Sequence, residues 1–163
     1  MTPEILLRDV IEDDLPCFFR HQRDPEAVRM AAFRPRDWEV FITHWKKILG
    51  DDSCITQAVI FKGRLAGNVV CWGDPDERKV GYWVGKEFWG KGVATAALSQ
   101  FLQLVKTRPL FAYVAKHNVA SLRVLQKNGF AVVGITEPHE EVSTDTPVEY
   151  ILRLAAHDGT RRE

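Results

Sequence analysis

The stretch from Val80 to Ala97, VGYWVGKEFWGKGVATAA, constrains the fold most. It predicts a strand, a short loop with Gly90 and Gly92, and the start of an alanine-rich helix. The first turn of a helix has N–H groups without an intrahelical partner and a partial positive charge, so phosphate oxygens bind there readily. Glycines lack Cβ, which lets the loop amides approach a diphosphate closely. The segment therefore predicts a phosphorylated cofactor at residues 90 to 95.

Two familiar phosphate-binding loops do not fit this segment. The dinucleotide fingerprint G-x-G-x-x-G would need glycine where Thr95 stands, and an acidic residue about 20 positions further on. No acidic residue lies between Lys106 and Asn128. The nucleoside triphosphate loop G-x-x-x-x-G-K-[ST] fails because Lys91 lies between the two glycines instead of after the second.

A third pattern fits better. The segment Trp89-Gly90-Lys91-Gly92-Val93-Ala94 resembles the acetyl-CoA diphosphate loop of the GNAT family of N-acetyltransferases, [QR]-x-x-G-x-[GA]. Trp89 departs from the usual Gln or Arg, and W-G-K-G-x-A-T is similar to the branch with the ribosomal-protein and other protein N-terminal acetyltransferases. A second segment, NVASLRVLQKNGF at 118–130, is similar to N-x-x-S-x-x-x-x-x-K-x-G-F of that branch. The resemblance extends from ILLRDVIEDDL near the N-terminus to Glu149-Tyr150-Ile151-Leu152.

The resemblance implies a mixed α/β fold in one domain, residues 1–154, followed by a polar tail at 155–163. The expected core is a twisted, mostly antiparallel sheet of about seven strands, with helices on both faces and a splayed parallel pair that holds the cofactor. A length of 163 residues with 45% hydrophobic content agrees with a single compact domain.

The hydrophobic periodicity places the elements of this fold. Strands are expected at 5–9, 55–61, 65–72, 79–84, 110–114, 131–135 and 148–154. Helices are expected around 16–21, from Pro25, at 38–49 between Asp37 and Gly50, from Val93 to before Pro109, and at 119–128. The helix after the glycine loop should bury Val93, Ala97, Phe101, Leu104 and Val105, and connect two parallel strands by a right-handed crossover.

The resemblance also assigns the site residues. The amides near Tyr82 and Val84 would bind the pantetheine arm, and one near Tyr82 would polarise the thioester carbonyl. Ser121 would donate a hydrogen bond to the departing thiolate, with Tyr113 as a weaker substitute, and no general base is assigned. The expected contacts of acetyl-CoA, the co-substrate, are Tyr82, Trp83, Val84, Trp89, Gly90, Lys91, Gly92, Val93, Ala94, Thr95, Asn118 and Ser121.

Structural roles for the same residues stay open at this point. The glycine loop fits a tight strand-to-helix turn, and Asn118 and Ser121 are good helix-capping types. Trp83, Phe88 and Trp89 are of the type that dominates apolar packing. No metal is expected, since the five histidines show no metal-ligand spacing.

Charge and composition restrict the partners and the location. With 22 basic and 22 acidic side chains there is no net field to attract nucleic acid. No apolar run approaches the roughly 20 residues of a membrane helix, so a cytoplasmic location is expected. The three cysteines, Cys17, Cys54 and Cys71, are expected to be reduced and mostly buried thiols. The resemblance is also compatible with a homodimer.

The acceptor is expected to be a primary amine on a small molecule, an antibiotic or a protein N-terminus. Two features give opposite indications: the acidic segment 137–145 would attract a cationic amine, and the basic segment 29–36 would suit an acceptor with a carboxylate or phosphate. Alternative functions are a non-catalytic acyl-CoA sensor or interaction module, and transfer of another short acyl group such as succinyl or propionyl.

Overall fold

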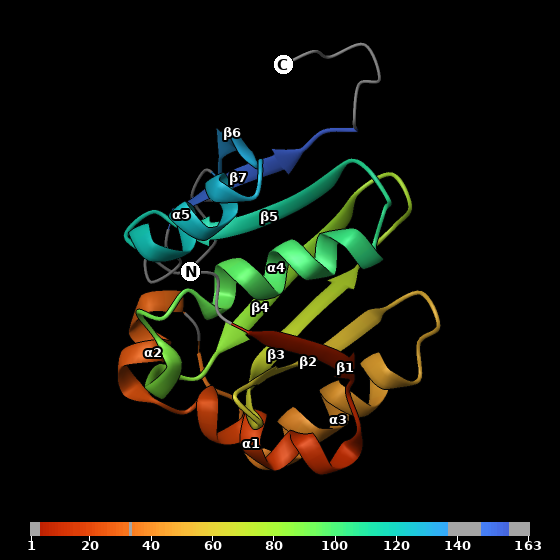
Figure 1. The fold of residues 1–163 in the computed structure, drawn as a ribbon, viewed down its shortest axis with the longest axis vertical. Helices are drawn as coiled ribbons and strands as arrows, with labels where there is room; N and C mark the ends of the chain where they lie inside the picture. The colour runs from red at the N-terminus through yellow and green to blue at the C-terminus, as the bar shows by residue number, and fades with distance from the viewer. Residues whose placement is uncertain (1–3, 33, 137–147, 157–163) are drawn as a thin grey trace, which may run out of the picture.

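The computed structural model describes residues 4–32, 34–136 and 148–156, and its centre is one seven-stranded sheet (Figure 1). The strand order is β1-β2-β3-β4-β5-β7-β6, and only β4 and β5 are parallel neighbours. The strands are β1 (Ile5–Asp9), β2 (Ile55–Phe61), β3 (Arg64–Trp72), β4 (Arg78–Val84), β5 (Leu110–Ala115), β6 (Ala131–Ile135) and β7 (Glu149–Leu154). The mixed, mostly antiparallel sheet predicted from the sequence is thus confirmed.

Five α-helices lie in the described part of the chain. They are α1 (Leu15–His21), α2 (Pro25–Ala31), α3 (Trp38–Leu49), α4 (Val93–Leu104) and α5 (Val119–Lys127), with short 3-10 turns at Glu12–Asp14 and Lys86–Phe88. The predicted cap of α3 is confirmed, because the Asp37 carboxylate accepts a hydrogen bond from the Val40 amide at 3.0 Å. Asp24 caps α2 in the same way, at 3.0 Å from the amides of Glu26 and Ala27.

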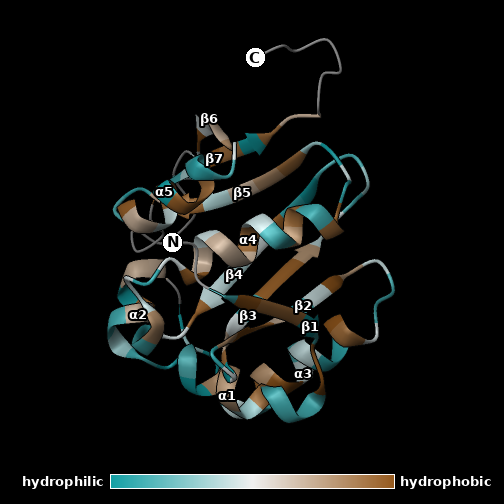
Figure 2. Ribbon diagram, viewed as in Figure 1, coloured by the Kyte–Doolittle hydropathy of each residue, from teal (hydrophilic) through white to brown (hydrophobic). Residues whose placement is uncertain are grey.

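Hydrophobic residues pack on both faces of the sheet. Ala58 and Val59 are adjacent on β2 and fully buried, yet they belong to different clusters, because successive side chains on a strand point to opposite faces. One cluster joins the sheet to α4 and α5, and the other joins it to α1 and α3. The ribbon coloured by hydropathy shows this concentration of apolar residues on the central strands (Figure 2).

Two details of the predicted packing are wrong. Leu104 is 60% exposed, although its helical angle matches the buried face of α4. It is the last residue of that helix, and Val105 after it takes an extended conformation that turns the chain away. Of the three thiols only Cys71 is buried; Cys17 and Cys54 are partly exposed, and all three are free.

Two further findings apply to residues 4–32, 34–136 and 148–156. No helix there is long and apolar enough to cross a membrane. No group of three His, Cys, Asp or Glu side chains there is arranged to hold a metal ion.

Candidate functional site

The parallel strands β4 and β5 separate soon after they meet. They pair only at Arg78 with Leu110 and at Lys79 with Phe111. On its other side β4 stays paired with β3, and the Gly85 amide donates to the Ala66 carbonyl at 2.8 Å. Because backbone groups alternate in direction along a strand, the N–H groups of Tyr82 and Val84 point away from β3, into the opening. The splayed pair expected from the sequence is present.

The glycine loop lies at the open end of β4. Gly90 and Gly92 both have φ of +76°, a left-handed conformation that residues with a Cβ rarely adopt. The Trp89 indole N–H donates to the Val84 carbonyl at 2.9 Å, which ties the loop to the strand end. Gly92 is the N-cap of α4 and provides no side-chain cap, so the amides of its first turn stay available.

Tyr82 and Ser121 meet across the opening. The Tyr82 hydroxyl lies 2.7 Å from the Ser121 hydroxyl and also donates to the Ser121 carbonyl at 3.2 Å. The Asn118 side-chain oxygen accepts from the Ser121 amide at 3.2 Å, so the capping role considered for Asn118 is confirmed. Burial raises the pKa of Tyr82 to about 12, although the hydrogen bond with Ser121 opposes the change. The phenol is therefore protonated throughout the neutral range.

A cavity of about 470 Å³ occupies this opening, and we call it the split-strand cavity. Every expected cofactor contact lines it except Lys91, which is exposed on the outside of the loop. Tyr113 does not line it either, and is 43% exposed on β5. Eight further residues line it: Ala27, Met30, Ala31, Phe88, Ala120, Arg123, Val124 and Lys127. Of these, Phe88 is the aromatic residue considered for apolar packing, Met30 and Ala31 belong to the basic segment considered for the acceptor, and sequence reasoning missed the other five.

Some of these residues have a pattern in the sequence that was overlooked, and others have none. Arg123 and Lys127 stand four residues apart on α5, which places both cations on one face of the helix. That spacing is visible in the sequence and would have identified them. Ala27 comes from α2 and is brought to the cavity by tertiary packing, for which the sequence has no local pattern.

A second cavity, of about 610 Å³, lies on the face of the sheet that α1 and α3 cover, and we call it the β3–α3 cavity. Tyr82 and Trp83 line both cavities. Because they are consecutive on β4, Tyr82 faces α5 and Trp83 faces the other side, where Asn68 is its cross-strand partner. The cavity is lined by Phe18, Gln22, Arg36, Phe41, His44, Trp45, Lys47, Ile48, Asp51, Cys54, Asn68, Val70, Trp72, Gly81, Tyr82 and Trp83.

The basic segment 29–36 reaches both cavities. Met30 and Ala31 line the first, and Arg36 lines the second. The Gln22 side chain fixes the Arg36 backbone, donating to its carbonyl at 3.1 Å and accepting from its amide at 3.2 Å. The acidic segment 137–145 lies outside the described residues.

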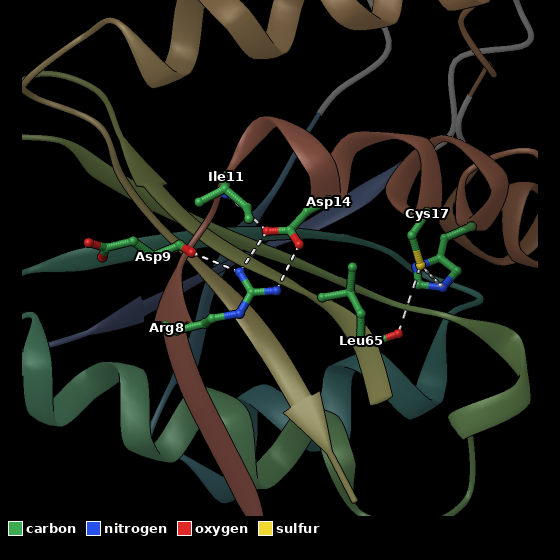
Figure 3. Close-up of polar contacts among 7 residues, drawn as sticks. Arg8, Asp9, Ile11, Asp14, Cys17 and Leu65 are labelled. Carbon is green, nitrogen blue, oxygen red and sulfur yellow. Dashed lines mark hydrogen bonds and ion pairs between the residues drawn. The ribbon is translucent and has the colours of Figure 1, made fainter. Parts of the chain in front are cut away.

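A third cavity, of about 720 Å³, lies near the α1 end of β3, with Cys17 and Arg64 in its wall. The Cys17 sulfur is 3.4 Å from the His21 Nε2 and 3.8 Å from the Leu65 carbonyl (Figure 3). Burial raises the pKa of Cys17, so the thiol is not activated. Arg64 is paired with Glu87 at 2.8 Å. The Cys17 thiol and the Arg64 and Glu87 charges of this cavity are thus engaged in local contacts.

The split strands, the left-handed glycine loop and a helix N-terminus whose first amides have no intrahelical partner are features of one class, the α/β domains that bind a diphosphate at a strand end. A family model described as an acetyltransferase (GNAT) domain matches residues 4–131. The chain therefore belongs to the GNAT acetyltransferase family.

Related proteins agree with this membership. A Bacillus subtilis (strain 168) protein, YdaF, provisionally named a ribosomal N-acetyltransferase, is 34% identical over 67 residues, which are 39% of this chain and 37% of YdaF. The match thus spans little more than a third of that relative.

Solved structures share the fold over nearly the whole chain. A Vibrio cholerae spermidine N-acetyltransferase, in complex with CoA and spermine, superposes with a TM-score of 0.79 at 15% identity, covering 93% of this chain and 95% of that one. A Bacillus anthracis acetyltransferase of the GNAT family gives 0.77 at 18% identity, covering 95% and 98%. A protein provisionally described as a phosphinothricin N-acetyltransferase gives 0.77 at 22% identity, covering 95% and 100%.

Proposed function

We propose that this protein transfers an acetyl group from acetyl-CoA to a primary amine by direct attack. The observation that supports this most is the position of the glycine loop at the open end of β4, where strand pairing with β5 has stopped. Membership of the GNAT family and the CoA complex of the V. cholerae neighbour agree with it.

The cofactor would bind in the split-strand cavity. Amides at residues 90–95 would hold the diphosphate, since the helix N-terminus adds a favourable partial charge. Arg123 and Lys127 would contribute two cations for the remaining phosphate oxygens. The pantetheine arm would run along β4, where the backbone at Tyr82 and Val84 has no strand partner on the open side.

Transfer then needs stabilisation of two developing charges. The amine nitrogen forms a bond to the acetyl carbon, and the carbonyl oxygen becomes negative in the tetrahedral intermediate. A backbone N–H at Tyr82 or Val84 that points into the opening can donate to that oxygen. The C–S bond then breaks, the CoA sulfur leaves as a thiolate, and the amine's proton balances the reaction by protonating the sulfur.

The Tyr82 and Ser121 hydroxyls are suited to stabilise the negative charge on the leaving CoA sulfur. A phenol with a pKa of about 12 keeps its proton beside a thiolate, whose conjugate thiol is far more acidic. The pair would therefore act as a chain of donors: the single Tyr82 hydrogen would turn from the Ser121 carbonyl to the Ser121 hydroxyl oxygen, and the Ser121 hydroxyl would donate to the sulfur. Ser121 thus keeps the role expected from the sequence, as donor to the departing thiolate. The Tyr82 side chain, for which only a backbone role was expected, would support Ser121 in that role.

The acceptor would approach from the β3–α3 cavity, because Tyr82 and Trp83 line both cavities and join them at the open end of β4. The names of the related proteins include a polyamine, phosphinothricin and ribosomal protein as acceptors. These differ in charge and size, so the acceptor class must be inferred from this chain's own residues. The cytoplasmic location and the homodimer remain predictions.

Thiol release provides the test. Purified protein with acetyl-CoA and a panel of amines should release CoA well above the hydrolysis background, and mass spectrometry should find the acetylated amine. Calorimetry in parallel should detect CoA binding. Tight CoA binding without release from any amine would contradict transfer and favour an acyl-CoA sensor; no CoA binding would contradict the site itself.

A further inference from the structure

The walls of the β3–α3 cavity suit a flat, apolar group. Six of its lining residues are Phe, Tyr or Trp and come from α1, α3, β3 and β4: Phe18, Phe41, Trp45, Trp72, Tyr82 and Trp83. The ring of Trp72 lies directly over Gly81, where an added Cβ would be only 3.3 Å from it. Since aromatic walls of this kind bind planar or apolar groups by stacking and area burial, the body of the acceptor is expected to be apolar.

The charges of the same cavity are mainly positive. Arg36 and Lys47 line it, whereas Asp51 is the one carboxylate among its described lining residues. The Asp51 carboxylate accepts from the Ser53 amide at 2.9 Å and from the Ser53 hydroxyl at 2.7 Å, so it is engaged in its own turn. Since a hydrogen-bonded carboxylate keeps its charge, the described lining residues have two cations and one anion, which leaves a net positive charge of one.

The lowered pKa of His44 is consistent with the positive charge of the cavity. Burial lowers the pKa of this imidazole, and the nearby charges of Arg36 and Lys47 lower it further. A field that disfavours a proton on His44 also favours an anion in the cavity.

The wall of the same cavity also includes the buried amide side chain of Asn68. Asn68 is 8% exposed, lines the cavity, and faces Trp83 across the strand pair. Its side chain makes no hydrogen bond to another residue in the described parts of the chain, and its amide atoms are not among the buried polar atoms without a partner. An amide that lines the cavity in this way is open to a polar group of a bound ligand.

We propose that the acceptor is an amine that also has a carboxylate and an apolar or aromatic body, as in an aromatic amino acid. The amine would lie near Asn68 and the open end of β4, the body between the aromatic walls, and the carboxylate at Arg36 and Lys47. The inference rests on the proposed acetyl transfer, of which it specifies the acceptor class. It disfavours polyamines, whose second cation would meet these two positive side chains.

Equilibrium binding tests this without turnover. The protein saturated with CoA is titrated with N-acetyl-L-phenylalanine and with N-acetyl-L-phenylalaninamide, which differ only in the carboxylate, and tryptophan fluorescence is followed. We expect the acid to bind about tenfold more tightly than the amide, as expected for one charge-assisted contact. Equal affinities would overturn the proposal, and so would displacement of the acid by spermidine at similar concentrations.

A matched pair of variants assigns the preference to the cavity. Lys47→Gln should reduce the ratio of the two affinities to about threefold or less, because one cation is lost. Lys46→Gln is the control: it is the adjacent lysine on α3, is exposed, and lies 4.0 Å from Glu12 outside the cavity. An unchanged ratio in Lys47→Gln, or equal losses in both variants, would contradict the assignment.

Turnover distinguishes this proposal from the proposed function. If acetyl transfer occurs but L-phenylalanine has no higher kcat/KM than spermidine, the acceptor class is wrong and the reaction stands. If no amine releases thiol while the acid still binds preferentially, the reaction is wrong and the cavity's preference stands.

Discussion

The Tyr82 hydroxyl lies 2.7 Å from the Ser121 hydroxyl, across the opening between β4 and α5. Tyr82 comes from the strand whose free backbone faces the cavity, and Ser121 from the helix that Asn118 caps. The contact therefore links the strand side and the helix side of the split-strand cavity at one point, which is where the thioester is expected to lie.

Removing either hydroxyl should slow transfer without weakening cofactor binding. We expect Ser121→Ala to lower kcat by about 10- to 100-fold, since it removes the donor to the developing thiolate, and Tyr82→Phe by about tenfold, since it removes the hydroxyl that supports Ser121. The Kd for CoA should change by less than about threefold. Because the two hydroxyls act as a unit, the double variant should lose less than the product of the single losses. Fully multiplicative losses would contradict a shared role.

The pH profile of kcat should rise and then stay level. The rise reports deprotonation of the acceptor amine, which must be neutral to attack. A raised pKa of about 12 keeps Tyr82 protonated, so the donor pair is not lost on the alkaline side until the pH approaches that value. Steady-state rates between pH 6 and about 10 check this. A descending limb centred below about pH 10 that disappears in Tyr82→Phe would contradict it.

A pair of glycine variants tests the diphosphate site. Gly90 and Gly63 have nearly the same left-handed φ, +76° and +77°, and an added Cβ would meet no atom within 4 Å at either position. Replacement by Asp should therefore cost similar stability, about 1 kcal/mol, at both. Only Gly90→Asp places a negative charge at the proposed phosphate site, and it should weaken CoA binding by at least about tenfold. Similar CoA affinities in the two variants, measured by calorimetry, would refute the site.

Local patterns in the sequence predicted the individual strands and helices, whereas their arrangement in a mixed sheet was implied by the family resemblance. The strand, glycine loop and helix from Val80 onward depend on hydrophobic periodicity and on backbone conformations that glycine favours, and both signals are local. The cap at Asp37 and the turn at Gly50 are likewise short-range. Leu104 was placed wrongly because its exposure depends on where α4 ends relative to the core.

The site was less predictable because it is assembled from distant segments. Position in the family motif placed Tyr82 and Ser121 at the site, yet that the two hydroxyls meet follows from how α5 docks against β4. The contribution of α2 to one cavity and of Arg36 to the other depends on packing and on the Gln22 contact. None of these relationships has a periodic or spacing signal in the chain.

The two cations on α5 give a prediction that salt concentration can test. Arg123→Gln or Lys127→Gln should weaken CoA binding by about three- to tenfold at low ionic strength, and less at high ionic strength, because exposed charges are screened. Arg153→Gln on β7 removes an exposed cation outside the split-strand cavity and should leave the affinity unchanged. Calorimetry at two salt concentrations is sufficient, and equal effects of all three variants would contradict the assignment.

The Arg8 and Asp14 ion pair should make stability depend on pH in acid. The two side chains are joined by two hydrogen bonds of 2.8 Å, and the Ile11 amide donates to Asp14 at 2.9 Å (Figure 3). Burial alone would raise the pKa of Asp14, but the hydrogen bonds from Arg8 and Ile11 and the Arg8 charge together lower it. A lowered folded-state pKa contributes stability above the ordinary aspartate value of about 3.9, and the contribution is lost as the pH falls through the folded value.

Asp14→Asn is the variant that tests this contribution. The side chain of Asp14 is 5% exposed and that of Arg8 is 38% exposed, so the loss at neutral pH should be about 2 kcal/mol, less than for a fully buried pair. Urea unfolding at pH 7 and between about pH 4 and 2.5 should show this difference shrinking as the pH falls, since the wild type also loses the charge. Asp13→Asn, on the exposed neighbour, is the control and should change stability by less than about 0.5 kcal/mol. A deficit in Asp14→Asn that stays constant down to the lowest pH would show that the ionised carboxylate is not what stabilises this turn.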